Sequence, residues 1–275
     1  MNFAETHRLF ASASPHAGAK RLRISDLPEE LRRRGELARQ PQPEGIPAPP
    51  LRLMLGEVGT FLGALWARRE ACGVAVAPTL SPRPVMLLPG FATHPRRMRA
   101  LSRALRAAGH RVCDWGLGWN LGATPERLDE VCSAVLAAAQ RECGPLALVG
   151  WSLGGLFARE AAKRHPDAVA LVVTMGSPFS GDLHANRAWR AYHWITGQDV
   201  ATPPIVDALG SKPPVRTVAL WSARDGIVHP RSACGRIGER DVAVALRCTH
   251  LGFPSDPGAI AEVLRQIDKA FSAPR

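Results

Sequence analysis

From Pro84 to the end of the chain, short apolar runs alternate with amphipathic stretches. The apolar runs predict six strands, which are Val85–Leu88, Arg111–Trp115, Leu146–Gly150, Val169–Met175, Val215–Trp221 and Val242–Leu246. The amphipathic stretches predict four helices, which are Arg96–Ala108, Pro125–Cys143, Leu153–His165 and Pro257–Phe271. Because strands that alternate with helices build a mainly parallel sheet flanked by helices, we predict one α/β domain over residues 84–275.

The segment 176–214 breaks this alternation, because it joins two predicted strands through a long stretch without a regular pattern. Three aromatic residues lie in its middle: Trp189, Tyr192 and Trp194. A connection this long inside a compact domain usually has a function. We therefore predict that residues 176–214 form a small helical cap over a site.

The chain before Pro84 predicts two further segments. Residues 1–50 are basic and rich in proline, with a short helical candidate at Leu27–Ala38 followed by an extended linker at Gln40–Pro50. Residues 51–83 begin with apolar residues at near-helical spacing over Leu51–Cys72, which predicts a helix packed on the α/β domain. A helix lying at a membrane interface is the alternative for this segment.

The composition is typical of a globular protein. Of the 275 residues, 46% are hydrophobic and 21% are charged, which excludes a disordered chain. The net charge of +11 comes mostly from arginines scattered along the chain, and no nucleic-acid-binding module is recognisable. We therefore expect no nucleic-acid partner, although weak attraction to anionic lipid is compatible with this charge.

The sequence predicts neither a secretory signal peptide nor a membrane span. Its longest apolar stretch, Leu51 to Trp66, is interrupted by Arg52 and Glu57 and is too short to cross a bilayer. We expect a cytoplasmic protein that at most associates peripherally with membranes. Residues 1–24 are basic and contain a single acid, so an organellar transit peptide is an open alternative.

The pentapeptide Gly150-Trp151-Ser152-Leu153-Gly154 lies between a predicted strand and an alanine-rich predicted helix. This context is typical of a nucleophile elbow, a turn so tight that the central serine takes a strained backbone conformation. Glycine flanks the turn because a side chain there would collide with the neighbouring strand or helix. Ser152 is therefore the candidate nucleophile, and an inert strand-to-helix turn is the alternative.

A serine nucleophile needs a base, and the base needs a carboxylate that orients it. Asp225 lies shortly after the fifth predicted strand, and His250 follows the last one. Their order along the chain, after Ser152, is the order that this architecture requires. For Asp225 the alternative is an Asp-Gly surface turn. His229 is the competing base, although no predicted strand separates it from Asp225.

Acyl transfer also needs backbone N–H groups that meet the charge developing on the carbonyl oxygen. The residue after the nucleophile supplies one of them, so the N–H of Leu153 is the first candidate. The loop Pro89-Gly90-Phe91-Ala92 follows the first predicted strand, and the N–H of Phe91 is the second candidate. His94 and His184 are further candidates for the lining of the cleft.

The six cysteines show no C-x-x-C spacing of the kind that binds metals. Several lie in apolar segments, where a free thiol packs as a small hydrophobic side chain. Cys234 and Cys248 both fall in loops near the candidate acid and base, so a disulfide between them is left open.

Five segments together resemble bacterial α/β-hydrolase lipases and esterases: Pro89-Gly90-Phe91, Gly150 to Gly154, Gly176-Ser177-Pro178, Ser222 to Val228, and His250. The resemblance covers residues 84–271. It implies an α/β-hydrolase fold with an eight-stranded sheet and a triad of Ser152, Asp225 and His250. It also implies that the protein needs neither a metal nor an organic cofactor. Pro89 stands where many of these lipases have histidine, which changes the edge of the oxyanion hole without removing its N–H donors.

The predicted chemistry is hydrolysis of a carboxylic ester through an acyl-enzyme. The expected substrate is a small-molecule or lipid ester with an apolar acyl group, because aromatic side chains are expected to line the site. These are Trp119, Trp151, Phe179, Trp189, Tyr192 and Trp194. Thioesterases, amidases and acyltransferases use the same triad. The alternative outside enzymes is a non-catalytic hydrolase scaffold used for binding.

Overall fold

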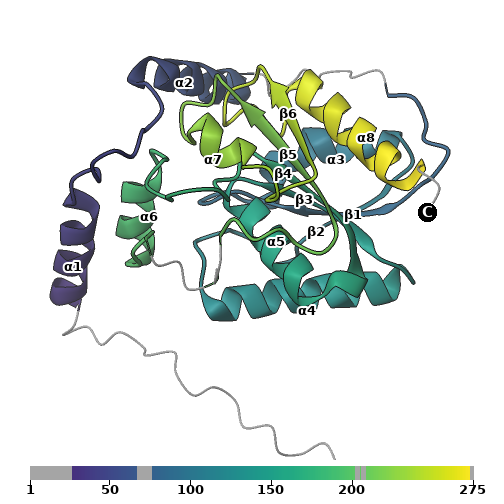
Figure 1. Cartoon of the computed structure of the whole chain (residues 1–275), viewed down its shortest axis with the longest axis horizontal. Coiled ribbons are helices and arrows are strands. Elements are labelled where there is room, and N and C mark those ends of the chain that lie inside the picture. Colours follow the sequence, from purple (N-terminus) through teal and green to yellow (C-terminus); the bar gives the residue numbers. More distant parts are fainter. Residues whose placement is uncertain (1–26, 67–75, 202–204, 206–208, 273–275) are drawn as a thin grey trace, which may run out of the picture.

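The computed structural model describes residues 27–66, 76–201, 205 and 209–272. Within these ranges six strands form one parallel sheet in the order β2-β1-β3-β4-β5-β6 (Figure 1). The strands are β1 (Pro84–Leu88), β2 (Arg111–Asp114), β3 (Leu146–Trp151), β4 (Val169–Met175), β5 (Arg216–Ser222) and β6 (Val242–Leu246). Their bounds lie within one residue of the predicted ones, and the predicted α/β fold class is confirmed.

The number of strands corrects one expectation. The resemblance to hydrolases implied eight strands, whereas the described part of the chain has six. The described residues before residue 76 form two helices, α1 (Leu27–Arg39) and α2 (Leu51–Trp66), so they add no strand to the sheet. Among the described residues, β2 and β6 are therefore the edges of the sheet.

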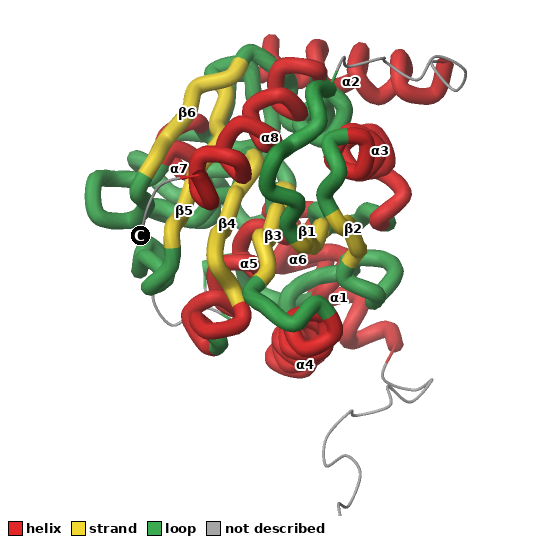
Figure 2. The backbone as a smooth tube through the Cα atoms, turned by 90° about the vertical axis from the view of Figure 1, so that its right-hand side faces the viewer, coloured by secondary structure: helices red, strands yellow, loops and turns green. Residues whose placement is uncertain are grey.

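Helices cover both faces of the sheet (Figure 2). They are α3 (Arg99–Ala107) and α8 (Pro257–Ser272) on one face, and α4 (Pro125–Arg141) and α5 (Leu153–Arg164) on the other. Successive side chains of β1 enter opposite layers: Val85 packs in the α3 and α8 layer, and Met86 packs in the α4 and α5 layer. Because both faces of the sheet are buried, its central strands appear in the sequence as unbroken apolar runs.

Four shorter helices complete the described chain, and three of them differ from the prediction. They are η2 (Pro95–Met98), η3 (Pro166–Ala168), α6 (Trp189–Thr196) and α7 (Pro230–Cys234). η2 separates from α3 because the His94 side chain accepts a hydrogen bond from the Arg96 N–H and starts a 3-10 turn there. η3 and α7, with three and five residues, are too short to show a helical period, so the sequence predicts neither. Residues 67–72 of the predicted N-terminal helix lie outside the described residues.

The cap and the N-terminal extension lie against each other. α6 is the helix of the predicted cap, and α1 packs beside it (Figure 1). The predicted linker Gln40–Pro50 is held on the cap, because Trp189 Nε1 donates to Gln42 Oε1 at 3.0 Å and Arg187 Nε donates to Pro49 O at 2.7 Å. Residues 202–204 and 206–208 of the predicted cap lie outside the described residues.

α2 is oriented opposite to what its apolar residues suggest. Leu51, Leu55, Val58 and Leu62 are exposed, and Leu55 has 76% of its surface accessible. Glu57, on the same helix, is 2% exposed. α2 therefore contacts the domain through its acidic residue, while Leu51, Leu55 and Leu62 face outward.

The five cysteines in the described ranges are free thiols. The disulfide considered between Cys234 and Cys248 is therefore not formed, because Cys248 is buried in the core beneath α8 whereas Cys234 ends α7. Burial raises the pKa of Cys248 to about 12, so its thiol stays protonated at neutral pH. Within the described ranges, no helix has the length and apolar character needed to cross a membrane.

Candidate active site

The turn at Ser152 joins β3 to α5 at the carboxyl end of the sheet. Ser152 has a φ of 53° and a ψ of −121°, a backbone conformation that side-chain-bearing residues rarely adopt. The Ser152 N–H donates to the carbonyl of Met175 at the end of β4, at 2.9 Å, and so ties the turn to the neighbouring strand. The strained backbone predicted from the pentapeptide is confirmed.

Glycine is required on both sides of this turn by close backbone contacts. A Cβ atom on Gly150 would lie 2.4 Å from the carbonyl oxygen of Gly154. A Cβ atom on Gly154 would lie 2.2 Å from the carbonyl oxygen of Leu88 in β1. Both obstacles are backbone atoms that cannot rotate away, so the glycines allow α5 to begin directly against the sheet.

Replacing Gly150 with alanine is therefore expected to destabilise the fold by about 3 kcal/mol, because α5 must move away from β3. Urea denaturation followed by circular dichroism measures the change in the free energy of unfolding. Gly59→Ala is the control, since Gly59 is exposed on α2 with open space around it. Alanine in place of a helical glycine should raise the free energy of unfolding by about 0.5–1 kcal/mol. A Gly150→Ala protein as stable as the wild type would contradict this packing.

Asp225 and His250 form a buried, hydrogen-bonded pair. His250 Nδ1 lies 2.7 Å from Asp225 Oδ2. His250 is 3% exposed and Asp225 is 1% exposed. The other carboxylate oxygen of Asp225 accepts hydrogen bonds from the N–H groups of Ile227 (2.9 Å) and Val228 (2.7 Å). With Asp225 ionised, Nδ1 carries the proton and donates it to the carboxylate, which leaves Nε2 as the basic nitrogen.

Opposing effects act on the pKa of His250. Burial lowers this pKa, whereas the charge of Asp225, its hydrogen bond and the charge of Glu57 raise it. The net result is a pKa above the ordinary value of a histidine. The imidazolium form is therefore stabilised, which favours a base that must accept a proton during a reaction.

The elbow and the histidine pair meet at Gly176, which follows β4. Gly176 has a φ of 58°, and a Cβ atom there would lie 3.1 Å from both Asp225 Oδ2 and His250 Nδ1. The preceding carbonyl, of Met175, accepts the N–H of Ser152. The Ser152 hydroxyl has no hydrogen bond within the described residues, and such contacts often tighten only when a substrate binds.

The loop after β1 lies directly over the elbow. A Cβ atom on Gly90 would lie 3.3 Å from Ser152 Cβ. Asn120 holds this loop, because its side-chain Nδ2 donates to Pro89 O at 2.8 Å and its backbone carbonyl accepts the Ala92 N–H at 2.7 Å. Within the described chain, the backbone N–H groups of Phe91 and Leu153 have no protein acceptor, so both are free to meet a ligand oxygen.

An apolar cavity opens beside Ser152. The volume open to the centre of a water-sized group is about 60 Å³. The cavity walls come from the loop after β1, from α5 and from the cap, and they include Phe91, Leu153, Leu156, Trp189, Tyr192 and Val200. A hydroxyl at the edge of an apolar cavity suits a ligand with a polar reacting group and an apolar tail.

Known proteins with sequence similarity match part of the chain. The family model described as alpha/beta hydrolase fold matches residues 142–204. A pimeloyl-[acyl-carrier protein] methyl ester esterase of Edwardsiella ictaluri is 36% identical over 109 residues, covering 39% of this chain and 40% of that protein. A protein of Oryza sativa subsp. indica named "Probable esterase PIR7A" is 45% identical over 84 residues, covering 27% and 31%. The chain thus spans less than half the length of these curated relatives.

Solved structures match most of the described fold. A lipase of Bacillus licheniformis superposes with a TM-score of 0.53 and 15% identity, covering 70% of this chain and 94% of that chain. A lipase-esterase related protein of Clostridium acetobutylicum gives a TM-score of 0.51 and 13% identity, covering 70% and 96%. The chain has the α/β-hydrolase fold. The resemblance to α/β-hydrolase lipases and esterases is confirmed.

This α/β-hydrolase fold brings two of the six predicted aromatic residues, Trp189 and Tyr192, to the cavity wall. The other four lie elsewhere. Trp119 is 56% exposed and stacks edge-on with His94, and Trp194 is 50% exposed. Phe179 is buried under the guanidinium of Arg159, at 4.2 Å from its ring centre.

Trp151 has a different role from the predicted contact with substrate. Its side chain is buried, and its Nε1 donates to the backbone carbonyl of His250 at 3.1 Å. The tryptophan at the variable position of the pentapeptide therefore fixes the loop that carries the histidine.

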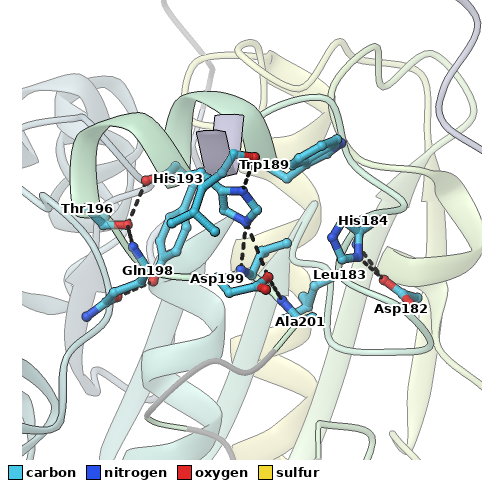
Figure 3. A network of polar contacts seen from close by, with 12 residues as sticks. Asp182, Leu183, His184, Trp189, His193, Thr196, Gln198, Asp199 and Ala201 are labelled. Atoms are coloured by element: carbon cyan, nitrogen blue, oxygen red, sulfur yellow. Dashed lines mark hydrogen bonds and ion pairs between the residues drawn. The ribbon is translucent and has the colours of Figure 1, made fainter. Parts of the chain in front are cut away.

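A polar network lies under α6 in the cap (Figure 3), and a hydrogen bond from His193 joins it to α1. His193 lies 3.1 Å from the carbonyl of Leu37 through Nδ1, and its Nε2 accepts the Val200 N–H at 2.8 Å. His184, Asp182 and Asp199 complete the network, and His184, His193 and Asp199 are close enough together to be considered as metal ligands. However, the Nε2 lone pair of His193 that would bind a metal already accepts the Val200 N–H. The network therefore connects segments of the cap through hydrogen bonds.

The remaining histidines considered from the sequence lie apart from the Asp225 carboxylate. His229 is the N-cap of α7, where its Nδ1 accepts the Arg231 N–H at 3.3 Å. Burial lowers the pKa of His229, and the charge of Arg231 lowers it further. His94 caps η2 in the same way. Neither residue lines the cavity beside Ser152.

Sequence reasoning missed two polar residues that hold the site together. Asn120 holds the loop after β1, and Glu57 binds the loops that carry Asp225 and His250. An asparagine in a glycine-rich loop gives no signal by itself. Glu57 does leave one, because it is an acid inside an otherwise apolar helix.

Proposed function

We propose that this chain is a serine esterase that cleaves carboxylic esters through Ser152, His250 and Asp225. The observation that carries the proposal is the position of Ser152, which lines an apolar cavity on a strained turn. The His250–Asp225 pair lies at the same end of the sheet and leaves a basic nitrogen free. The fold alone supports many reactions, so the site carries the argument.

In the first half of the reaction, His250 Nε2 accepts the Ser152 proton while Ser152 Oγ bonds to the ester carbonyl carbon. The Phe91 and Leu153 N–H groups donate to the resulting oxyanion. The carbon–oxygen bond to the leaving alcohol then breaks, and His250 returns the proton to that alcohol. The product is an acyl group on Ser152.

In the second half, water replaces the alcohol. His250 Nε2 accepts a proton from water as the water oxygen bonds to the acyl carbon. The bond to Ser152 Oγ breaks, and His250 returns the proton to the serine. The carboxylic acid leaves, while Asp225 holds Nδ1–H throughout and keeps the imidazole in the working tautomer.

The cavity supports an ester with an apolar acyl chain. Its described lining contains no charged side chain, and its aromatic members, Phe91, Trp189 and Tyr192, offer flat surfaces to an alkyl or aryl group. One matched relative is named as a methyl ester esterase, which agrees with an ester bond to a small alcohol. We propose acyl chains of short to medium length.

A panel of matched p-nitrophenyl ester, thioester and anilide substrates tests this function, combined with a fluorophosphonate probe that labels activated serines. We expect ester hydrolysis to be fastest and the probe to label Ser152. Faster thioester or amide cleavage would assign the same site to a thioesterase or an amidase. Absence of both labelling and turnover would point to a binding scaffold.

Filling the cavity should change the preferred chain length. Val200 lines the cavity and is 7% exposed, so Val200→Phe is expected to lower kcat/KM for octanoate esters about 10-fold or more while affecting acetate much less. Ile195→Phe is the control, because Ile195 is 40% exposed on α6 and does not line the cavity. Equal losses on both esters would contradict this placement of the acyl chain.

A further inference from the structure

α2 contributes a buried carboxylate to the environment of the site. Glu57 is 2% exposed, although Leu51, Leu55 and Leu62 of the same helix are exposed. Burying an acidic side chain is unfavourable unless its oxygens find strong partners. In the described chain, Glu57 has no ion pair with a cationic side chain, so its oxygens need other hydrogen-bond donors.

The partners of Glu57 are three backbone N–H groups from two loops. Glu57 Oε1 accepts from Gly226 N at 2.9 Å and from His250 N at 2.6 Å. Glu57 Oε2 accepts from Leu251 N at 2.8 Å. Gly226 directly follows Asp225, so one carboxylate bridges the loop of the candidate acid and the loop of the candidate base.

Two further contacts fix α2 on these loops. A Cβ atom on Gly226 would lie 2.7 Å from the carbonyl oxygen of Leu53. Only glycine at position 226 therefore allows α2 to lie this close to the loop that carries Asp225. Thr60 Oγ1 lies 2.8 Å from Thr249 Oγ1, next to His250. These contacts fix the position of the Glu57 carboxylate against the two loops.

We propose that Glu57 is a positioning residue that holds the Asp225 and His250 loops in register for the reaction at Ser152. This inference rests on the proposed esterase function. The backbone of His250 is then fixed on both sides, because Glu57 binds its N–H and Trp151 Nε1 binds its carbonyl. The bridge needs an acceptor with two oxygens, which an acidic side chain supplies and an apolar helix residue does not.

The charge of Glu57 also acts on His250. Among the described residues, Asp225 and Glu57 are the charged groups that act on the imidazole. The Arg97 guanidinium donates to the carbonyl of the neighbouring Leu251 at 3.4 Å. Burial lowers the pKa of His250, and the two carboxylates raise it. Removing the charge of Glu57 alone is expected to lower that pKa, so His250 becomes neutral at a lower pH.

The test compares Glu57→Gln, Glu57→Ala and wild type in the full chain. Glutamine keeps the length of the side chain but places an NH₂ group against one N–H donor, so we expect kcat to fall about 10- to 100-fold. KM should change little, since Glu57 does not line the cavity. The acid limb of the kcat/KM profile should move to lower pH. Leu55→Gln, on the exposed face of α2, is the control and should match wild type.

A second measurement does not depend on turnover. NMR titration of the His250 imidazole, assigned with a His250→Gln variant, should give a lower pKa in Glu57→Gln than in wild type. If wild type hydrolyses no ester, the proposed function fails, and this titration alone decides the role of Glu57.

Two results would overturn the inference. One is a folded Glu57→Gln protein with wild-type kcat and an unchanged His250 titration. The other is a variant with a lower melting temperature whose folded fraction keeps the wild-type rate and pH profile, because Glu57 would then only stabilise the fold. If Glu57→Ala fails to fold, the isosteric glutamine variant decides.

Discussion

Replacing Ser152 with alanine is expected to lower kcat/KM for p-nitrophenyl esters by about 10⁴- to 10⁶-fold. The substitution removes the attacking oxygen, while the N–H groups of Phe91 and Leu153 and the apolar cavity stay in place. Some activity above the uncatalysed rate should therefore survive. Initial rates of p-nitrophenol release at matched protein concentrations measure the loss.

Two controls separate this loss from damage to the fold. Ser133→Ala changes an exposed serine on α4 and should keep full activity. The melting temperature of Ser152→Ala should stay close to that of wild type, because Ser152 Oγ makes no hydrogen bond in the described structure. Ester hydrolysis retained by Ser152→Ala would place the reaction at another residue.

Replacing Asp225 with asparagine is expected to lower kcat by about 10⁴-fold. One carboxylate oxygen accepts Nδ1–H of His250 at 2.7 Å and the other accepts the N–H groups of Ile227 and Val228. Asparagine has a single acceptor oxygen, so it cannot replace both. If the amide NH₂ faces His250, Nδ1 becomes the acceptor and Nε2 carries the proton. Nε2 then no longer accepts the proton of Ser152.

The same variant should change the pH dependence of the residual activity. Burial lowers the pKa of His250, and the charge of Asp225 opposes that effect. Without this charge the imidazole stays neutral to a lower pH, so the acid limb of kcat/KM shifts downward. Asp167→Asn, at an exposed position in η3, is the control and should leave both rate and profile unchanged. An Asp225→Asn protein with the wild-type acid limb would contradict the pairing.

The sheet could be predicted from the sequence because its strands and turns depend on residues that are neighbours in the chain. Strands buried on both faces appear as apolar runs, and a turn that brings a helix onto a strand needs glycine, as at Gly150 and Gly154. Asp225 and His250 follow their strands in the expected order, and parallel strands bring their carboxyl ends to one edge. The pairing of these two side chains follows from that geometry.

The cap and the supporting residues could not be predicted in the same way. Trp189 lines the cavity while Trp194, on the same helix, is half exposed, and only the packing of α6 against its neighbours distinguishes them. Glu57 reads as an interruption of an apolar helix, yet its three acceptor contacts join segments almost 200 residues apart. Backbone N–H donors leave no trace in the sequence, so such a bridge is visible only in the structure.

The most direct test of the account is to trap the acyl group on Ser152. Wild-type protein is mixed with a p-nitrophenyl ester, quenched with acid during the first turnovers, and analysed by peptide mass spectrometry. The account predicts an acyl adduct on the peptide that contains Ser152, formed together with a burst of p-nitrophenol and absent in Ser152→Ala. Turnover without any acylated Ser152, or with the acyl group on a different residue, would contradict it.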